Sequence, residues 1–115
     1  MESLDEAARL ARIPALRAAT AFFPDERRGH SRLRDSVISA NPGLQERELL
    51  KMAALTDSCA AALRERGVDD RAATLAAHSA VTVFHVAFVR WVSADEPLDF
   101  ADCVGEAATA LRALT

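Results

Sequence analysis

The chain has 115 residues, of which half are apolar, 27% are charged and only 5% are aromatic. This length predicts a single domain, residues 1–115, with one hydrophobic core, and the composition is typical of an Ala- and Leu-rich helical protein. Charges of both signs are interspersed to a formal net charge of −3, which excludes a strong positive field for binding nucleic acid. The acidic start of the chain is the reverse of a basic signal-peptide start, so we expect a cytoplasmic protein.

The two cysteines support the same compartment. Cys59 and Cys103 are not spaced as a C-x-x-C motif, and both lie among small apolar residues. Cysteine in such surroundings usually behaves as a small buried hydrophobic residue. We therefore expect reduced thiols in a cytosolic protein.

Start and stop signals divide the sequence into five to six helices, so the predicted fold class is all-α, an antiparallel bundle. Ser3 and Glu6 form a capping box that begins the first helix. Pro14 predicts a kink or break in this helix before a second piece ends near Phe23. Residues 25–40 then form a charged amphipathic helix with its arginines mostly outward. The spacing predicts that its inward side chains are Leu33 and Val37, with Ala40 as a further candidate.

Three clearer helices follow. Asn41 is a preferred N-cap and Gly67 a left-handed stop, which predicts a helix over residues 42–66. Asp69 caps a fourth helix that extends to about Ser93. Asp99 caps the last helix, in which apolar residues recur at three- and four-residue steps. The chain carries no alternation of apolar and polar residues that would predict a β-strand.

Residues 72–89 of the fourth helix contain no Asp, Glu, Lys or Arg. Their number reaches the lower end of the range for a membrane span, but the Ala, His, Ser and Thr among them favour a soluble helix that is buried on most sides. One small domain covers only part of such a helix. We therefore expect a two-fold homodimer, in which the last two helices of each chain form a four-helix bundle. The predicted interface residues are Val81, Phe84, Trp91, Ala101, Gly105, Ala108 and Arg112.

The run NPGLQERELLKMAALTDSCAAALRERGV is followed by DDRAATLAAHSAVTVFHVAFVRW and by a final amphipathic helix. This succession of helix lengths and residue types resembles the C-terminal regulatory domain of TetR-type transcriptional repressors over about residues 15–114. The resemblance implies that the last two helices build the dimer interface and that the earlier ones enclose a pocket for a small-molecule effector. It also implies that DNA is bound only through a helix-turn-helix domain, which we expect to be absent from this chain.

Several side chains are candidate contacts for such a ligand. His78 and His85 are either hydrogen-bonded core histidines or polar groups that orient a ligand in an apolar cavity. Phe88 shares the side of His85. On the inner stripe of the third helix, Met52 offers an adaptable thioether, Thr56 a hydroxyl and Cys59 a thiol. These side chains either pack in the core or line the pocket. The candidate ligand contacts are Met52, Thr56, Cys59, His78, His85 and Phe88.

Metal and catalytic chemistry find little support in the sequence. His78 and His85 are two helical turns apart, about 10.5 Å, too far for both to ligate one zinc ion. The sequence has neither an H-E-x-x-H motif nor a Cys/His cluster, and no nucleophile, base and orienting group can be assembled from its spacings. We expect no metal, no cofactor, no catalytic residues and no contact with a membrane.

The leading hypothesis is an effector-binding and dimerisation domain that senses a small, largely apolar molecule. One alternative is a free-standing helical-bundle module for protein interaction. Another is an enzyme or metal protein that uses His78 or His85.

Overall fold

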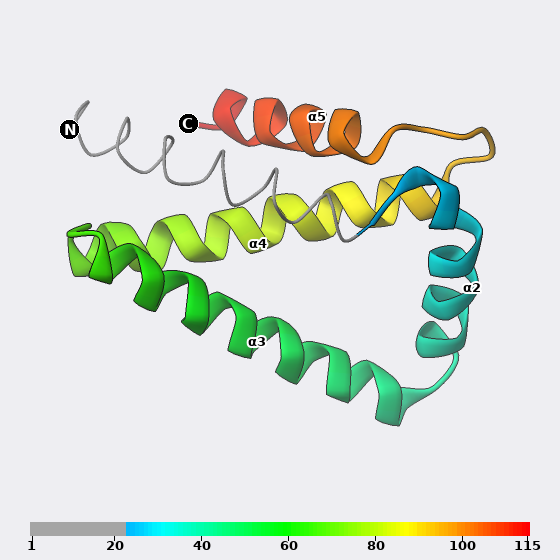
Figure 1. Cartoon of the computed structure of the whole chain (residues 1–115), viewed down its shortest axis with the longest axis horizontal. Coiled ribbons are helices and arrows are strands. Elements are labelled where there is room, and N and C mark those ends of the chain that lie inside the picture. The colour runs from blue at the N-terminus through cyan, green and yellow to red at the C-terminus, as the bar shows by residue number, and fades with distance from the viewer. Residues whose placement is uncertain (1–22) are drawn as a thin grey trace.

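The computed structural model describes residues 23–115, which form four α-helices preceded by one 3₁₀ turn (Figure 1). In chain order the elements are η1 (Asp25–Arg27), α2 (Arg28–Ser39), α3 (Pro42–Glu65), α4 (Asp70–Ser93) and α5 (Phe100–Ala113). The predicted all-α class is confirmed. The two helical pieces predicted before Phe23 lie outside the described residues, so this part of the chain has fewer helices than the five to six expected of the whole.

The last three helices begin where the sequence signals predicted. The side-chain oxygen of Asn41 accepts hydrogen bonds from two backbone N–H groups in the first turn of α3, at 3.0 and 3.2 Å. Asp69 and Asp99 cap α4 and α5 in the same way. Gly67 follows α3 with φ +88°, a left-handed conformation that favours glycine. Local side-chain chemistry therefore fixes the bounds of these helices.

The helices α3 and α4 form an antiparallel hairpin that opens away from its turn (Figure 1). Near the turn, Leu63 of α3 packs against Ala73 and Ala76 of α4, whose small side chains allow close approach. Farther along, the two helices separate, and α2 bridges their open ends. The helix α5 lies along α4 and away from α3. The result is a triangle of α2, α3 and α4, with α5 added along one side.

The main core lies where α4 ends and α5 begins. Trp91 and Phe100 are the largest fully buried side chains, and their ring centroids are 5.0 Å apart. Phe23 packs against both rings, and Val83 and Val104 are buried in the same cluster. This core joins α4, α5 and the segment before α2.

Some large apolar side chains do not lie where their spacing predicted. Trp91, expected at the dimer interface, is 0% exposed and has no surface left for a second chain. Leu33 and Val37, expected to point inward from α2, are 65% and 52% exposed. The physical reason is that α2 crosses the open end of the hairpin, where only part of its apolar face meets another helix (Figure 1).

The helix α4 is long and apolar enough to cross a membrane by length and composition. Core helices of soluble proteins pass the same test. The helix α4 packs along α3 on one side and along α5 on another, and 28% of its most apolar window is buried within the chain; one such helix is weak evidence for a membrane span.

Replacing Trp91 with alanine is expected to lower the free energy of unfolding by about 3–5 kcal/mol, because the change leaves a large cavity in the main core. Urea denaturation followed by circular dichroism measures this loss. Leu50→Ala, at a position that is 66% exposed, is the control and should change the stability by less than about 0.5 kcal/mol. Equal effects of the two substitutions would contradict the central place of Trp91.

Candidate functional site

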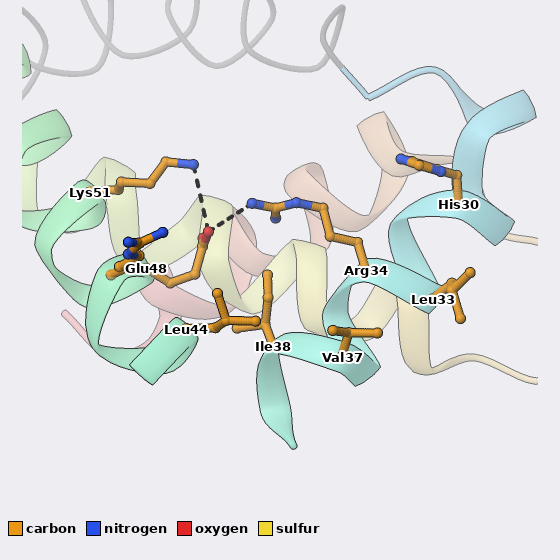
Figure 2. Close-up of a pocket in the computed structure, with 9 residues that line it drawn as sticks. His30, Leu33, Arg34, Val37, Ile38, Leu44, Glu48 and Lys51 are labelled. Atoms are coloured by element: carbon orange, nitrogen blue, oxygen red, sulfur yellow. Dashed lines mark hydrogen bonds and ion pairs between the residues drawn. The ribbon is translucent and has the colours of Figure 1, made fainter. Parts of the chain in front are cut away.

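A surface groove of about 520 Å³ lies where α2 meets the first turns of α3 (Figure 2). We call it the α2–α3 groove. Its lining combines apolar side chains with basic ones, drawn from both helices. The lining residues are His30, Leu33, Arg34, Val37, Ile38, Leu44, Arg47, Glu48 and Lys51.

A small ionic network crosses the groove. Figure 2 shows Arg34 of α2 and Lys51 of α3 reaching toward Glu48 from opposite sides. The Arg34 Nη2 lies 2.8 Å from the Glu48 carboxylate and the Lys51 Nζ lies 3.6 Å from it. With Arg47 also in the lining, the groove is bordered by three Arg or Lys side chains and by one carboxylate. The groove is therefore positively charged at its rim and apolar along its floor.

The network also sets the charge state of Glu48. Partial burial of its carboxyl opposes ionisation, but the hydrogen bond and charge of Arg34, together with the charge of Lys51, outweigh this and lower the pKa of Glu48 below its ordinary value. The ionised carboxylate thus links α2 to α3 at neutral pH. Because the side chains of Arg34 and Glu48 are 51% and 32% exposed, water screens this link and keeps its contribution small.

This arrangement is suited to binding. An apolar floor with a few polar groups at its edge can hold and orient a small molecule with a largely apolar body. Within residues 23–115, no three His, Cys, Asp or Glu side chains come together in a way that could hold a metal ion.

The ligand contacts expected from the sequence lie elsewhere. None of them is among the residues that line the α2–α3 groove. Thr56 is buried, but its hydroxyl donates to the backbone carbonyl of Met52 at 2.9 Å, within its own helix. His78 and His85 are exposed on α4. Phe88 packs against the rings of the main core, and Met52 and Cys59 are half-buried.

The basic stretch of α2 does not by itself reveal the groove. Its arginines beside Leu33 and Val37 predict a solvated helix face with the leucine inward. The mixture of exposed apolar and basic residues on one short helix is the signal that could have pointed to a groove. The contribution of α3 could not be seen in the sequence, since it depends on how α2 and α3 meet.

The expected interface residues have mixed positions. Val81 and Phe84 are half-buried, while Trp91 is enclosed in the core. On α5, Ala101, Gly105 and Arg112 are exposed and Ala108 is half-buried, and a side chain added at Gly105 would meet nothing within 4 Å.

The sequence reasoning missed the outward face of α4. Val86 and Val89 are 52% and 43% exposed there. Next to them, Arg90 pairs with Glu106 of α5 at 3.3 Å, so α4 and α5 share this surface. We call the surface formed by Val86, Val89, Arg90 and Glu106 the α4–α5 face.

Comparison with known proteins agrees with this architecture. Residues 7–115 match a TetR C-terminal domain family that is described as the MftR C-terminal domain. The chain belongs to the TetR family of C-terminal domains. No curated protein matches it.

Membership of the TetR family places the chain among regulators of transcription and implies a regulatory rather than an enzymatic role. TetR-family domains generally dimerise and bind small-molecule effectors.

The Glu48→Gln substitution tests the network in the groove. Because the folded-state pKa of Glu48 is lowered, its carboxylate stabilises the fold above its unfolded pKa of about 4.3, and this contribution disappears as the pH falls through the folded pKa. The variant should be less stable than the parent at pH 7, by less than about 1 kcal/mol, and equal to it near pH 3. Denaturant titrations across this range measure the difference.

Glu46→Gln, at an exposed position of the same helix, is the matched control. Its stability relative to the parent should be the same at pH 7 and at pH 3. A stability difference for Glu48→Gln that stays constant from pH 7 to pH 3 would show that the carboxylate is not held ionised by its neighbours.

Proposed function

We propose that this chain is the effector-binding and dimerisation domain of a TetR-like transcriptional repressor, and that it senses a small, largely apolar molecule. The observation that carries the proposal is the TetR-family match over residues 7–115. DNA would be bound only through a helix-turn-helix domain outside this chain. We also propose that the domain acts in the cytoplasm.

The α2–α3 groove supports the sensing part of the proposal. Leu33 and Val37 expose most of their side chains there. Covering such apolar area with a ligand gains about 25 cal/mol for each Å² removed from water. The basic rim offers Arg47 and Lys51 to a polar or negatively charged group at one end of the ligand. The proposed ligand is therefore apolar along most of its length.

The α4–α5 face supports the dimerisation part. The exposed Val86 and Val89 lie on the outward side of a helix whose opposite side is already filled by the core. The open surface at Gly105 allows another helix to approach α5 closely. A second copy related by a two-fold axis would cover the same residues on both chains. We propose that in this pairing Val86 and Val89 take the place that the sequence prediction gave to Trp91.

A protein-interaction module is the second candidate. Exposed leucines of α3 favour it, because Leu49, Leu50 and Leu55 are 72%, 66% and 46% exposed. Such a module would bind a defined partner chain in equal amounts and would not dimerise by itself. Dimerisation of the isolated domain therefore separates the two candidates.

A thermal-shift screen tests the sensing function. A compound present at 100 times its dissociation constant stabilises the folded chain by about 2.7 kcal/mol, which raises the melting temperature by several degrees. We expect at least one small, largely apolar compound to do so. The Leu33→Ser variant should lose the shift, whereas Leu50→Ser on the outer side of α3 should keep it. A shift that survives Leu33→Ser would place the ligand elsewhere.

Sedimentation equilibrium tests the dimer. The chain should be dimeric at micromolar concentration, and Val86→Asp or Val89→Asp should weaken the dimer at least about tenfold, because a charge would be buried in the interface. Leu50→Asp is the matched control and should leave the dimer intact.

Gly105→Ala refines the dimer test. The substitution should stabilise the α5 helix by about 1 kcal/mol in the monomer, yet weaken the dimer if a partner helix approaches this position. A stable monomer of the parent chain at micromolar concentration would refute the proposed interface.

A further inference from the structure

One carboxylate connects the start of the described chain to the junction of α4 and α5. The Oδ1 atom of Asp25 accepts a hydrogen bond from the indole N–H of Trp91 at 3.1 Å and another from the backbone N–H of Phe100 at 2.9 Å. The first of these bonds spans 66 residues of sequence and the second spans 75. Asp25 thus adds a distant cap to the N-terminus of α5, beside the local cap of Asp99.

An arginine one helical turn later holds the other side of the same junction. Arg28 donates from Nε to the carbonyl of Trp91 at 2.7 Å and from Nη2 to the carbonyl of Ala94. These carbonyls belong to the end of α4 and its C-cap, where free backbone acceptors and the helix dipole favour a cation. The acidic group therefore meets the start of one helix and the basic group meets the end of the other. We call Asp25 and Arg28 together the α2 clamp.

The clamp lies at one end of α2, and the α2–α3 groove lies along the rest of that helix. The helix has 12 residues, a length of about 18 Å. Its Leu33 and Val37 line the groove, and Arg34 reaches across it to Glu48. A short helix that is fixed at one end and bears a binding surface along its length moves as a rigid unit. Any tilt of α2 must therefore change the hydrogen bonds of the clamp.

The other side of the clamp belongs to the surface proposed for dimerisation. Trp91 is part of the same helix as Val86 and Val89, and its backbone carbonyl is one of the two that Arg28 holds. Phe100 is the first residue of α5. The clamp consequently touches both helices that form the α4–α5 face.

We propose that the α2 clamp couples the groove to the α4–α5 pair, so that a molecule bound in the groove changes the junction of α4 and α5 through Asp25 and Arg28. This inference rests on the proposed function, since it takes the groove as the ligand site. Asp25 and Arg28 are positioning residues in this scheme and do not touch the ligand.

Hydrogen exchange measured by mass spectrometry tests whether the clamp holds the junction. In Asp25→Ala and in Arg28→Met, amide exchange over residues 90–104 should become about tenfold faster, while exchange at the turn between α3 and α4 stays unchanged. The milder Asp25→Asn and Arg28→Lys, which keep an acceptor and a donor, should give smaller changes. Glu26→Ala and Arg27→Met alter exposed neighbours in η1 and serve as matched controls.

The dye anilinonaphthalene sulfonate then tests the coupling itself, because its apolar rings and its negative charge suit the groove. Its binding to the parent chain should require Leu33, as shown by loss of binding in Leu33→Ser. Bound dye should change the exchange rate of residues 90–104 in the parent and in the two controls. In Asp25→Ala and Arg28→Met the dye should still bind, but these residues should no longer respond to it. A purely structural role would leave that response in place.

The outcomes are distinct. Dye binding that does not depend on Leu33 would refute the groove as the ligand site, and the coupling with it. Dye bound in the groove without any response of residues 90–104 in the parent would overturn the coupling and leave the groove intact. An equal response in parent and clamp variants would do the same. Should an alanine or methionine variant not fold, the test uses Asp25→Asn and Arg28→Lys. A reduced response of residues 90–104 to the dye supports the coupling, and an unchanged response overturns it.

Discussion

The contact between Trp91 and Phe100 determines how the rest of the chain is arranged. These two rings are buried where α4 ends and α5 begins, with Phe23 against both. The chain contains one tryptophan and five phenylalanines, and Phe23, Phe84, Phe88 and Phe100 all pack in this cluster with Trp91. The turn between α3 and α4 is instead packed with Leu63 and alanines. The large rings lie between α4 and α5, and the open end of the α3–α4 hairpin is bridged by α2.

The groove is a consequence of that distribution. Close approach of α3 and α4 at the turn depends on small side chains such as Ala73, and the helices separate toward α2 (Figure 1). The side chain of Leu49, near the start of α3, remains 72% exposed for this reason. Across the corner, α2 meets α3 through the Arg34–Glu48 pair, an exposed contact of low strength. One end of α2 is thus held firmly by Asp25 and Arg28, and its other end is held weakly, which is suitable for a helix that responds to a ligand.

The sequence predicted the helices well because their ends depend on local chemistry. Asn41, Asp69 and Asp99 act on N–H groups two or three residues away, so a short stretch of sequence contains the whole interaction. It could not predict the α2 clamp or the α2–α3 groove, because these depend on pairings between residues far apart in the sequence. The partners Asp25 and Trp91 are 66 residues apart, and helical spacing shows which residues share a face but not what that face meets. Trp91 was for this reason assigned to an interface instead of the core.

The stretch of α4 without charged residues, residues 72–89, is buried on one side and exposed on the other. Its inner side, with Ala77, Val83 and Ala87, is buried within the chain, whereas Leu75 and Val86 on its outer side are 62% and 52% exposed. The surface that the proposed second copy would cover is therefore smaller than the sequence suggested, and it belongs to the same helix that carries Trp91. Helices transmit small rotations along their length because their backbone hydrogen bonds resist bending. A movement at the clamped end of α4 must then reposition the outward valines a turn away, which gives a dimer of such domains a physical means to respond to a molecule bound beside α2.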